Sequence, residues 1–496
     1  MNSNRVFFIA LLFLVCLFRY FFSGQIELIP DEAYYWGWSN YLSFGYYDHP
    51  PMVAIFIAIS TAIVGETEQG IRLAAILSGL GITLISYRLG YSLFQSPRVG
   101  IYSAVFFNLI LIFSLGSVII TPDTPLILFF ALSLLFIYRA IWESKPYFWY
   151  GAGLAIGGAL LSKYNGVLIL PCLGLFILFS KNYKNLWKQK EPYIAMAIAC
   201  VCFLPVILWN ASHDWVSFRF QFFRGIQGPS INPILSFLEF LGAQALVVTP
   251  FIFISMGIVI TYCYKLWESE KDDRFLFLFV FSVPIFLFFL VFSFQTKIQG
   301  NWPVMAYFAP TLALPGIYLT RGGKQKIIDN KILRFIKKWA IITVVLFIVL
   351  AHLQGIFRVV PLPPKTDVFL KKAYGWKQLG EYIGTFYSGL QKDGETFVFT
   401  DRHNIAAELS FYLPGKPQVF KIHGLKRYSY FGNLSHLLSK DGLYVFEEGR
   451  GNLNLVQPQF EAMFEMPIVS IKWEGKTIRK FRVFWCRGYR GNLLEI

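Results

Sequence analysis

Acidic residues cluster directly after the first apolar segment, in the stretch ELIPDEAYYWGWSNYLSFGYYDHPP at residues 27–51. Pro30 ends an extended run, and Asp31 and Glu32 then open a helix that we expect to continue to Leu42. Ionised carboxylates are favoured there because the helix dipole is positive at its N-terminus. An acid at a helix start is often only a cap. It can also serve as a general base, and this is the chemistry that we predict for the pair.

A further acid, Asp123, lies between two prolines in TPDTP, residues 121–125. If Asp123 and Asp31 face one cavity, their oxygens can hold a divalent cation, with Mg²⁺ or Mn²⁺ as the predicted ions and Zn²⁺ as an alternative. One carboxylate can instead act as the base while the other binds the metal. The predicted catalytic residues are therefore Asp31, Glu32 and Asp123, and the predicted metal ligands are Asp31 and Asp123.

Basic side chains follow later apolar runs: Lys163 in SKYNG, His213 in NASHDW and Lys297 in KIQGNWP. Each has an ordinary alternative, because a lysine can snorkel to lipid headgroups and a histidine can be an interfacial loop residue. Acids and lysines in one cavity nevertheless suit a lipid-linked phosphate, whose leaving group needs cations while its acceptor needs a base. The predicted donor phosphate or sugar contacts are His49, Lys163, Tyr164, His213 and Lys297.

The composition defines the elements that must position these residues. Of 496 residues, 55% are hydrophobic and only 15% are charged, and the apolar runs reach bilayer-spanning length. The chain is therefore predicted to be a polytopic α-helical membrane protein in contact with membrane lipids. Its net charge of +16 falls largely in short loops between spans, which is typical of positive-inside topology and excludes nucleic acid as the expected partner.

One alternation of spans places the basic loops in the cytoplasm. The spans that we predict are about 5–23, 70–90, 99–119, 124–142, 147–162, 166–180, 191–209, 238–262, 275–294, 303–319 and 339–356. Residues 52–64 are apolar but short, and a crossing there would invert every later basic loop, so we place them at the outer interface. The total is about eleven spans, or up to thirteen if this segment and one other cross. All the motifs above then lie at outer ends of spans.

The composition changes after the proline-rich linker VPLPPKTD, residues 360–367. Short β-like runs follow, namely TFVFT, QVF, LYVF, VSIKW and KFRVFW, with the helical run NIAAELSFYL between them. We therefore predict a transmembrane domain over 1–360, with a first outer loop at 24–69, and an α/β domain over 361–496. An odd number of spans exports this small domain, to the periplasm in a Gram-negative cell.

The glycine-rich run GAGLAIGG, residues 151–158, superficially resembles a dinucleotide-binding loop. It lies inside an apolar span with no preceding strand, which favours close helix packing instead.

The ordered set of motifs, PDE, DHPP, TPDTP, SKYNG and a lysine before an Asn-Trp-Pro turn, resembles the GT-C-type membrane glycosyltransferases. Within them the chain is similar to the branch that contains protein O-mannosyltransferases and the lipid A aminoarabinose transferase. The resemblance covers roughly residues 5–320, and DRHNIAAELSFYLPGKP at 401–417 is similar to the exported tail of many bacterial members.

The resemblance implies inverting transfer of a hexose or pentose from a polyprenyl phosphate to a lipid A, glycan or protein acceptor. The reaction would take place at the periplasmic face of the bacterial inner membrane, without a nucleotide. Asp31 matches the first-loop acid with the catalytic role, Glu32 is its neighbour, and Asp123 matches the second acid that supports the site or its metal. His49 stands where aminoarabinose transferases typically carry a lysine, so Lys163 or Lys297 is expected to supply the charge for the phosphate.

Two other classes of function, a transporter and a scaffold, are alternatives to an enzyme. A lipid-linked sugar flippase also needs many spans and charged cavities, but it should carry ionisable residues along a path that reaches both faces. Here they collect at one predicted face. A membrane scaffold would explain the tail but not the converging acids.

Overall fold

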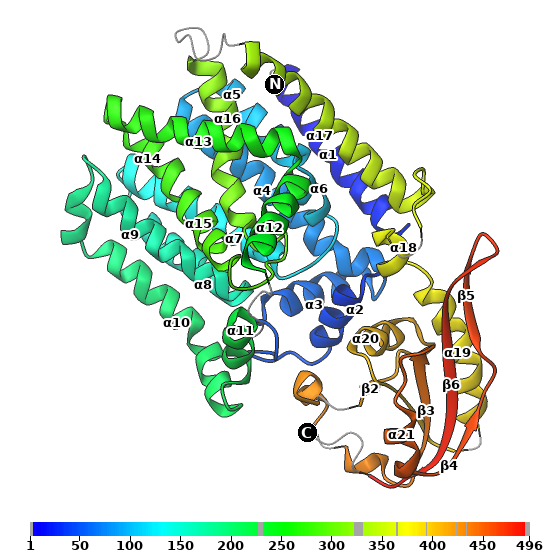
Figure 1. Cartoon of the computed structure of the whole chain (residues 1–496). Helices are drawn as coiled ribbons and strands as arrows, with labels where there is room; N and C mark the ends of the chain where they lie inside the picture. Colours follow the sequence, from blue (N-terminus) through cyan, green and yellow to red (C-terminus); the bar gives the residue numbers. More distant parts are fainter. Residues whose placement is uncertain are drawn as a thin grey trace. The chain divides into compact units, whose positions relative to one another are not determined.

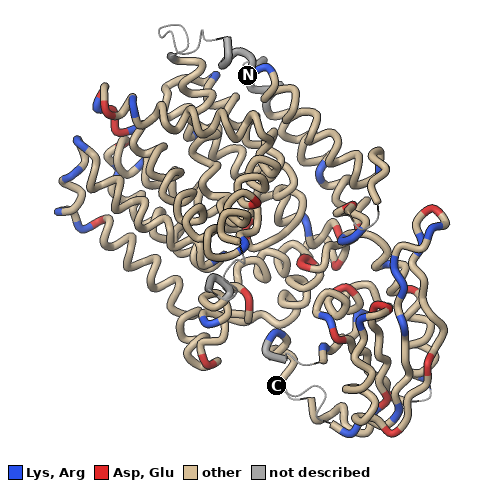
Figure 2. Tube along the Cα trace, viewed as in Figure 1, with Lys and Arg blue, Asp and Glu red and all other residues tan. Residues whose placement is uncertain are grey.

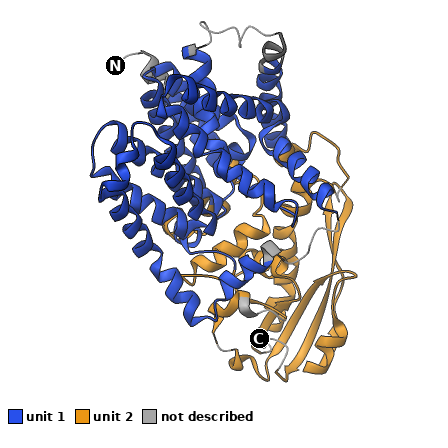
Figure 3. Cartoon of the chain, turned by 60° about the vertical axis from the view of Figure 1, so that its left-hand side comes forward, with its two compact units in different colours: residues 1–21, 48–56, 72–353 blue, residues 22–47, 57–71, 354–496 orange. Residues whose placement is uncertain are grey.

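A computed structural model describes residues 3–226, 232–321, 331–363, 366–392, 394–422, 425–432 and 434–491. Two compact units divide the chain (Figure 3). Unit 1 comprises residues 1–21, 48–56 and 72–353, and unit 2 comprises residues 22–47, 57–71 and 354–496. Unit 2 therefore combines the C-terminal region with two pieces from the first outer loop that the sequence predicted.

Unit 1 is built of apolar helices (Figure 1). The helices that lie wholly or partly in it are α1 (Ser3–Ser23), α3 (Met52–Val64), α4 (Glu68–Phe94), α5 (Pro97–Leu109), α6 (Leu111–Gly116), α7 (Asp123–Trp142), α8 (Phe148–Ser162), α9 (Ile169–Phe179), α10 (Glu191–Ser212), α11 (Val216–Ile226), α12 (Pro233–Val248), α13 (Pro250–Glu270), α14 (Asp273–Val280), α15 (Val283–Phe292), α16 (Phe308–Arg321) and α17 (Lys331–Phe357). Within the described residues, six helical segments are long and apolar enough to cross a membrane. Several shorter apolar helices accompany them, which confirms the predicted helical fold class.

The predicted span 238–262 was wrong, because the structure has two helices there. α12 ends at Val248 and α13 begins at Pro250. Thr249 between them has φ 74° and ψ 142°, since a proline disfavours a helical residue before it and offers no N–H to continue the helix. α13 alone is still long enough to span.

Small residues allow α8 to pack closely against its neighbours, as the glycine-rich run predicted. A Cβ added at Gly157 would lie 2.5 Å from Cys202 Cβ of α10, and one at Gly158 would lie 2.5 Å from Phe129 of α7. These positions therefore require glycine for close helix contact. The packing of α7, α8 and α10 fixes the start of α7 and the end of α8, where two predicted site residues lie.

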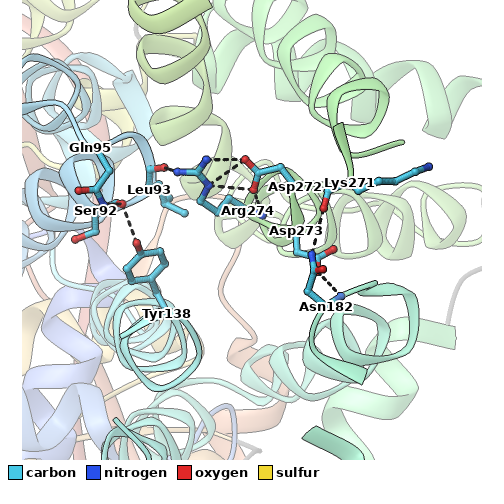
Figure 4. A network of polar contacts seen from close by, with 9 residues as sticks. All are labelled: Ser92, Leu93, Gln95, Tyr138, Asn182, Lys271, Asp272, Asp273 and Arg274. Atoms are coloured by element: carbon cyan, nitrogen blue, oxygen red, sulfur yellow. Dashed lines mark hydrogen bonds and ion pairs between the residues drawn. The ribbon is translucent and has the colours of Figure 1, made fainter. Parts of the chain in front are cut away.

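Charged residues of unit 1 lie mainly at helix ends and connections along the chain (Figure 2). A network of hydrogen bonds and ion pairs links the end of α4 to the segments that follow α9 and α13 (Figure 4). Asp273 is 2% exposed and accepts hydrogen bonds from Ser180 Oγ, Asn182 N and Trp267 Nε1. Arg274 pairs with Asp272 and donates to the Leu93 carbonyl. This cluster holds helix ends together. The basic segment between Arg321 and Lys338 lies largely outside the described residues.

Unit 2 carries a six-stranded sheet of β1 (Thr396–Thr400), β2 (Val419–Lys421), β3 (Asp441–Glu447), β4 (Phe460–Glu465), β5 (Val469–Trp473) and β6 (Lys476–Tyr489). Its order is β2-β1-β3-β6-β4, with β5 also paired to β6. β1 is parallel to β2 and β3, whereas β6 is antiparallel to β3, β4 and β5. The sheet and its helices confirm the predicted small α/β domain.

Helices α18 (Val368–Lys372), α19 (Trp376–Leu390), α20 (His403–Tyr412) and α21 (Leu453–Val456) complete the C-terminal part of unit 2, and α2 (Pro30–Ser39) packs on α20. The rings of Trp36 and Phe411 lie 5.1 Å apart, edge to face. Leu28 N donates to the Tyr412 hydroxyl over 2.8 Å, although the two residues are 384 positions apart in the sequence. The helix that opens with Asp31 is thus part of the same folded unit as the C-terminal sheet.

Candidate functional site

Asp123 and Lys163 form an ion pair at one end of an antiparallel helix pair. Asp123 is the first residue of α7, and Lys163 directly follows α8. Because a short connection joins α7 to α8, the start of the first lies level with the end of the second. Lys163 Nζ lies 2.7 Å from Asp123 Oδ1, and the two side chains are only 9% and 13% exposed.

The second oxygen of Asp123 is also bound. Asn301 Nδ2, from the connection between α15 and the 3₁₀ turn Val304–Tyr307, donates to Asp123 Oδ2. Asn301 was not among the predicted site residues, although GNWP was recognised as one of the motifs at an outer end. The signal that would have identified it is an amide beside a proline turn at the level of a predicted buried acid.

This arrangement fixes Asp123 between a cation and an amide donor. A carboxylate whose two oxygens both accept hydrogen bonds is held in one orientation. Lys163 has three N–H donors, and one of them contacts Asp123. The ammonium group can therefore bind a further anion, such as a phosphate, while Asp123 holds it in place.

The surroundings of Asp123 do not fit a resident divalent ion. Such an ion needs several oxygen ligands at about 2.0–2.6 Å, whereas the nearest partners of this carboxylate are an ammonium and an amide NH₂. Among the described residues, no group of three His, Cys, Asp or Glu side chains is placed to hold a metal. The metal stays a prediction that these donors do not support.

In unit 2 the two acids of α2 occupy different environments. Glu32 is fully buried, and its Oε2 accepts a hydrogen bond of 3.1 Å from Ile29 N, which caps the helix. Asp31 lies one residue earlier and is exposed. The helix cap expected of an acid at this start is therefore made by Glu32.

Tyr164 and His213 make local contacts. The Tyr164 hydroxyl lies 2.6 Å from Ser217 Oγ of α11. His213 is exposed at the end of α10, where its ring stacks on Trp209 with centroids 4.2 Å apart. Neither contact includes the pair formed by Asp123 and Lys163.

Lys297 lies on the surface of unit 1 and pairs with Glu239 over 3.0 Å, with its side chain 80% exposed. His49 belongs to the short piece of unit 1 that precedes α3, where the neighbouring Asp48 carbonyl accepts a hydrogen bond from Gln221. Of the predicted residues, the structure thus brings Asp123 and Lys163 together. Their roles in binding or catalysis stay predictions.

Comparison with known proteins shows which family and which relatives the chain resembles. The family described as dolichyl-phosphate-mannose-protein mannosyltransferase matches residues 48–209. The lipid A galacturonosyltransferase RgtD of Rhizobium johnstonii is 28% identical over 392 residues, covering 78% of each chain. The undecaprenyl phosphate-alpha-4-amino-4-deoxy-L-arabinose arabinosyl transferase 1 of Pseudomonas fluorescens is 24% identical over 357 residues, covering 66% of this chain and 60% of the relative.

Solved structures show the same fold. ArnT from Cupriavidus metallidurans bound to undecaprenyl phosphate superposes with a TM-score of 0.67 at 16% identity, over 98% of both chains. The archaeal oligosaccharyltransferase AglB from Archaeoglobus fulgidus gives a TM-score of 0.50 at 13% identity, over 94% of this chain and 74% of the other. The family match, the two relatives and this shared fold confirm the resemblance drawn from the sequence motifs, which is a resemblance to the GT-C-type membrane glycosyltransferases.

Proposed function

We propose that this protein transfers a hexose or pentose from a polyprenyl-phosphate donor to lipid A or a related lipid glycan. The reaction takes place at the periplasmic face of a bacterial inner membrane. The relatives support the two substrates, because one is named for lipid A and the other for an undecaprenyl-phosphate sugar. A protein acceptor stays open within the same chemistry.

The observation that carries the proposal is that the two acids of α2 lie in different environments. Glu32 is buried and caps the helix, whereas Asp31 is exposed beside it. An exposed carboxylate in the first turn of a helix can be reached by an acceptor hydroxyl and can take its proton. We therefore assign the general base to Asp31, and to Glu32 the support of the helix that presents it.

The transfer follows from that assignment. Asp31 takes the proton of the acceptor hydroxyl as the oxygen attacks the anomeric carbon of the donor sugar. The bond between this carbon and the phosphate oxygen breaks on the opposite face, which inverts the configuration. The electron pair leaves with the polyprenyl phosphate, and Lys163 is the cation that we assign to its charge.

Asp123 and Asn301 are positioning residues in this scheme, since Asp123 holds the Lys163 ammonium group and Asn301 holds the Asp123 carboxylate. His49, Tyr164 and His213 stay candidates for further donor contacts, and the exposed Lys297 is the alternative to Lys163 for the phosphate charge. No part of the scheme requires a divalent ion, and transfer that survives EDTA would remove Mg²⁺, Mn²⁺ and Zn²⁺ from the proposal.

Two measurements test the proposed function. Purified protein in vesicles should move sugar from a synthetic polyprenyl-phosphate sugar to lipid A, with the product detected by mass spectrometry. Lipid A from a deletion strain should lack one sugar that returns with the gene. Unmodified lipid A in both experiments, with a protein or another glycan carrying the sugar instead, would reject lipid A as the acceptor.

A further inference from the structure

Unit 2 contains a recess of about 400 Å³, part of it open to solvent, that none of the assigned roles uses. Its walls come from α2, from α20, from residues 416–418 and from the turn Leu425–Phe431. All of the lining residues belong to unit 2, so the fold of this unit alone forms the recess.

Six of the 14 residues that line the recess are aromatic. Tyr34, Trp36 and Tyr428 are almost fully buried and make its floor. Two of them are fixed by hydrogen bonds, from Tyr34 Oη to the Arg427 carbonyl over 3.4 Å and from Tyr428 Oη to the His403 carbonyl over 3.1 Å. The floor is therefore held in place without a ligand.

The rim of the recess offers half-buried rings. The Tyr41 ring lies 5.4 Å from that of Tyr430 and 5.6 Å from that of Phe431. Flat, partly exposed aromatic faces bury the apolar C–H faces of a pyranose ring, while the hydroxyl edge of the sugar remains available for hydrogen bonds.

Polar groups for that edge lie on the same rim. Asn40, Ser410 and Gln418 line the recess, and Gln418 Nε2 already donates to the Tyr41 hydroxyl. Amides and hydroxyls of this kind both donate and accept, which matches the alternating hydroxyls of a sugar. The arrangement thus combines stacking faces with neutral hydrogen-bonding groups.

The charge of the recess argues against an anion. Lys416 is its cationic side chain among the lining residues, and it is paired with Glu66 Oε2 over 3.1 Å and bonded to the Glu66 carbonyl over 2.7 Å. Its ammonium group also lies 4.3 Å from the centre of the Phe411 ring. A phosphate would have to displace these partners, whereas an uncharged ring would not.

We infer that this recess binds a neutral hexopyranose ring of the acceptor glycan. The inference rests on the proposed function, because Asp31 lies in the first turn of the same helix. From Asp31 to Gly37, which lines the recess, α2 rises about 9 Å at 1.5 Å per residue. A glycan held by one ring in the recess can therefore extend along α2 toward the carboxylate at its start.

The full-length protein in detergent micelles tests this by saturation-transfer NMR with the β-1,6-linked glucosamine disaccharide carrying N-acetyl groups and neither acyl chains nor phosphates. Wild type should transfer saturation to the protons of the pyranose ring. Tyr430→Ala removes a rim ring and should weaken binding about tenfold. Gly37→Phe should fill the recess, because a Cβ there already lies 3.5 Å from the Tyr430 hydroxyl.

Tyr382→Ala is the matched control, since Tyr382 is a 49% exposed tyrosine of α19 that does not line the recess. Asp31→Asn should bind the disaccharide as well as wild type, which separates this binding from the transfer reaction. Binding without any transfer by wild type would reject the proposed function alone. No saturation transfer in wild type, or equal transfer in the Tyr430 and Gly37 variants, would overturn the sugar site.

Discussion

Lys163 Nζ lies 2.7 Å from Asp123 Oδ1, although the two residues are 40 positions apart and lie at the end of α8 and the start of α7. Both side chains are nearly buried, and Asn301 holds the other carboxylate oxygen. Removing one partner of such a pair leaves an uncompensated charge, which is costly, whereas an exposed pair contributes little. The pair formed by Lys297 and Glu239, exposed by 80% and 46%, is the natural comparison.

Lys163→Gln should weaken binding of the polyprenyl-phosphate donor by more than about tenfold, since a charge-assisted contact to phosphate is lost. Lys297→Gln should stay within about threefold of wild type because its exposed ammonium group is screened by water and salt. Binding of undecaprenyl phosphate, followed by native mass spectrometry, checks both. The reverse order of effects would move the phosphate contact to Lys297.

Gly157→Ala should destabilise unit 1 by roughly 1–3 kcal/mol, because the new Cβ would lie 2.5 Å from Cys202 Cβ. Gly174→Ala in α9 is the control, since no atom lies within 4 Å of a Cβ there. Alanine has the higher helix propensity, so the control should be neutral or stabilising. Thermal unfolding of both variants in one detergent tests the difference, and an unchanged melting temperature for Gly157→Ala would contradict close packing.

Unit 2 should lose stability in mild acid. Burial, together with the nearby charges of Arg427, Lys421 and Arg402, lowers the pKa of His403 to about 4 from 6.5. The unfolded chain therefore binds a proton near pH 6.5 that the folded chain binds only near pH 4. The stability held by neutral His403 is complete above pH 6.5 and is lost as the pH falls toward 4. His403→Gln should flatten the melting temperature between pH 7 and 5; an unchanged slope would exclude this histidine as the cause.

The sequence alone was sufficient where a local pattern decides the structure. TFVFT and VSIKW became β1 and β5 with the predicted residues, because short β-branched and aromatic runs bounded by turns favour strands. The strand FEAMFE was missed, since its alternation is weak and its pairing with β6 is a long-range contact. The break at Thr249 could have been read from the following Pro250.

Less of the candidate site than of the fold could be predicted from the sequence. Both carboxylates of the TPDTP and PDE motifs were identified, but their partners come from distant segments, as Asn301 shows for Asp123. Which acid caps α2 also depends on side-chain direction: Glu32, and not its neighbour, reaches back to Ile29 N. Spacing alone does not determine that choice.

Opposite compartments are predicted for two reporter fusions, one after Lys190 and one after Asp401. The positive-inside alternation places the first in the cytoplasm and the second in the periplasm. An alkaline phosphatase reporter should be active only after Asp401, and a green fluorescent protein reporter should fluoresce only after Lys190. Activity of one reporter at both positions would contradict the outer-face reaction.

The general base is the central claim, and sugar transfer by Asp31→Asn in reconstituted vesicles tests it most directly. Asparagine keeps the size of the side chain but cannot take the proton, so transfer should fall by about 10² to 10⁴ while donor binding and folding remain. Glu32→Gln is the matched control, because its amide oxygen can still accept the hydrogen bond from Ile29 N and should preserve both the helix and transfer. Transfer by Asp31→Asn within a few-fold of wild type would contradict the account.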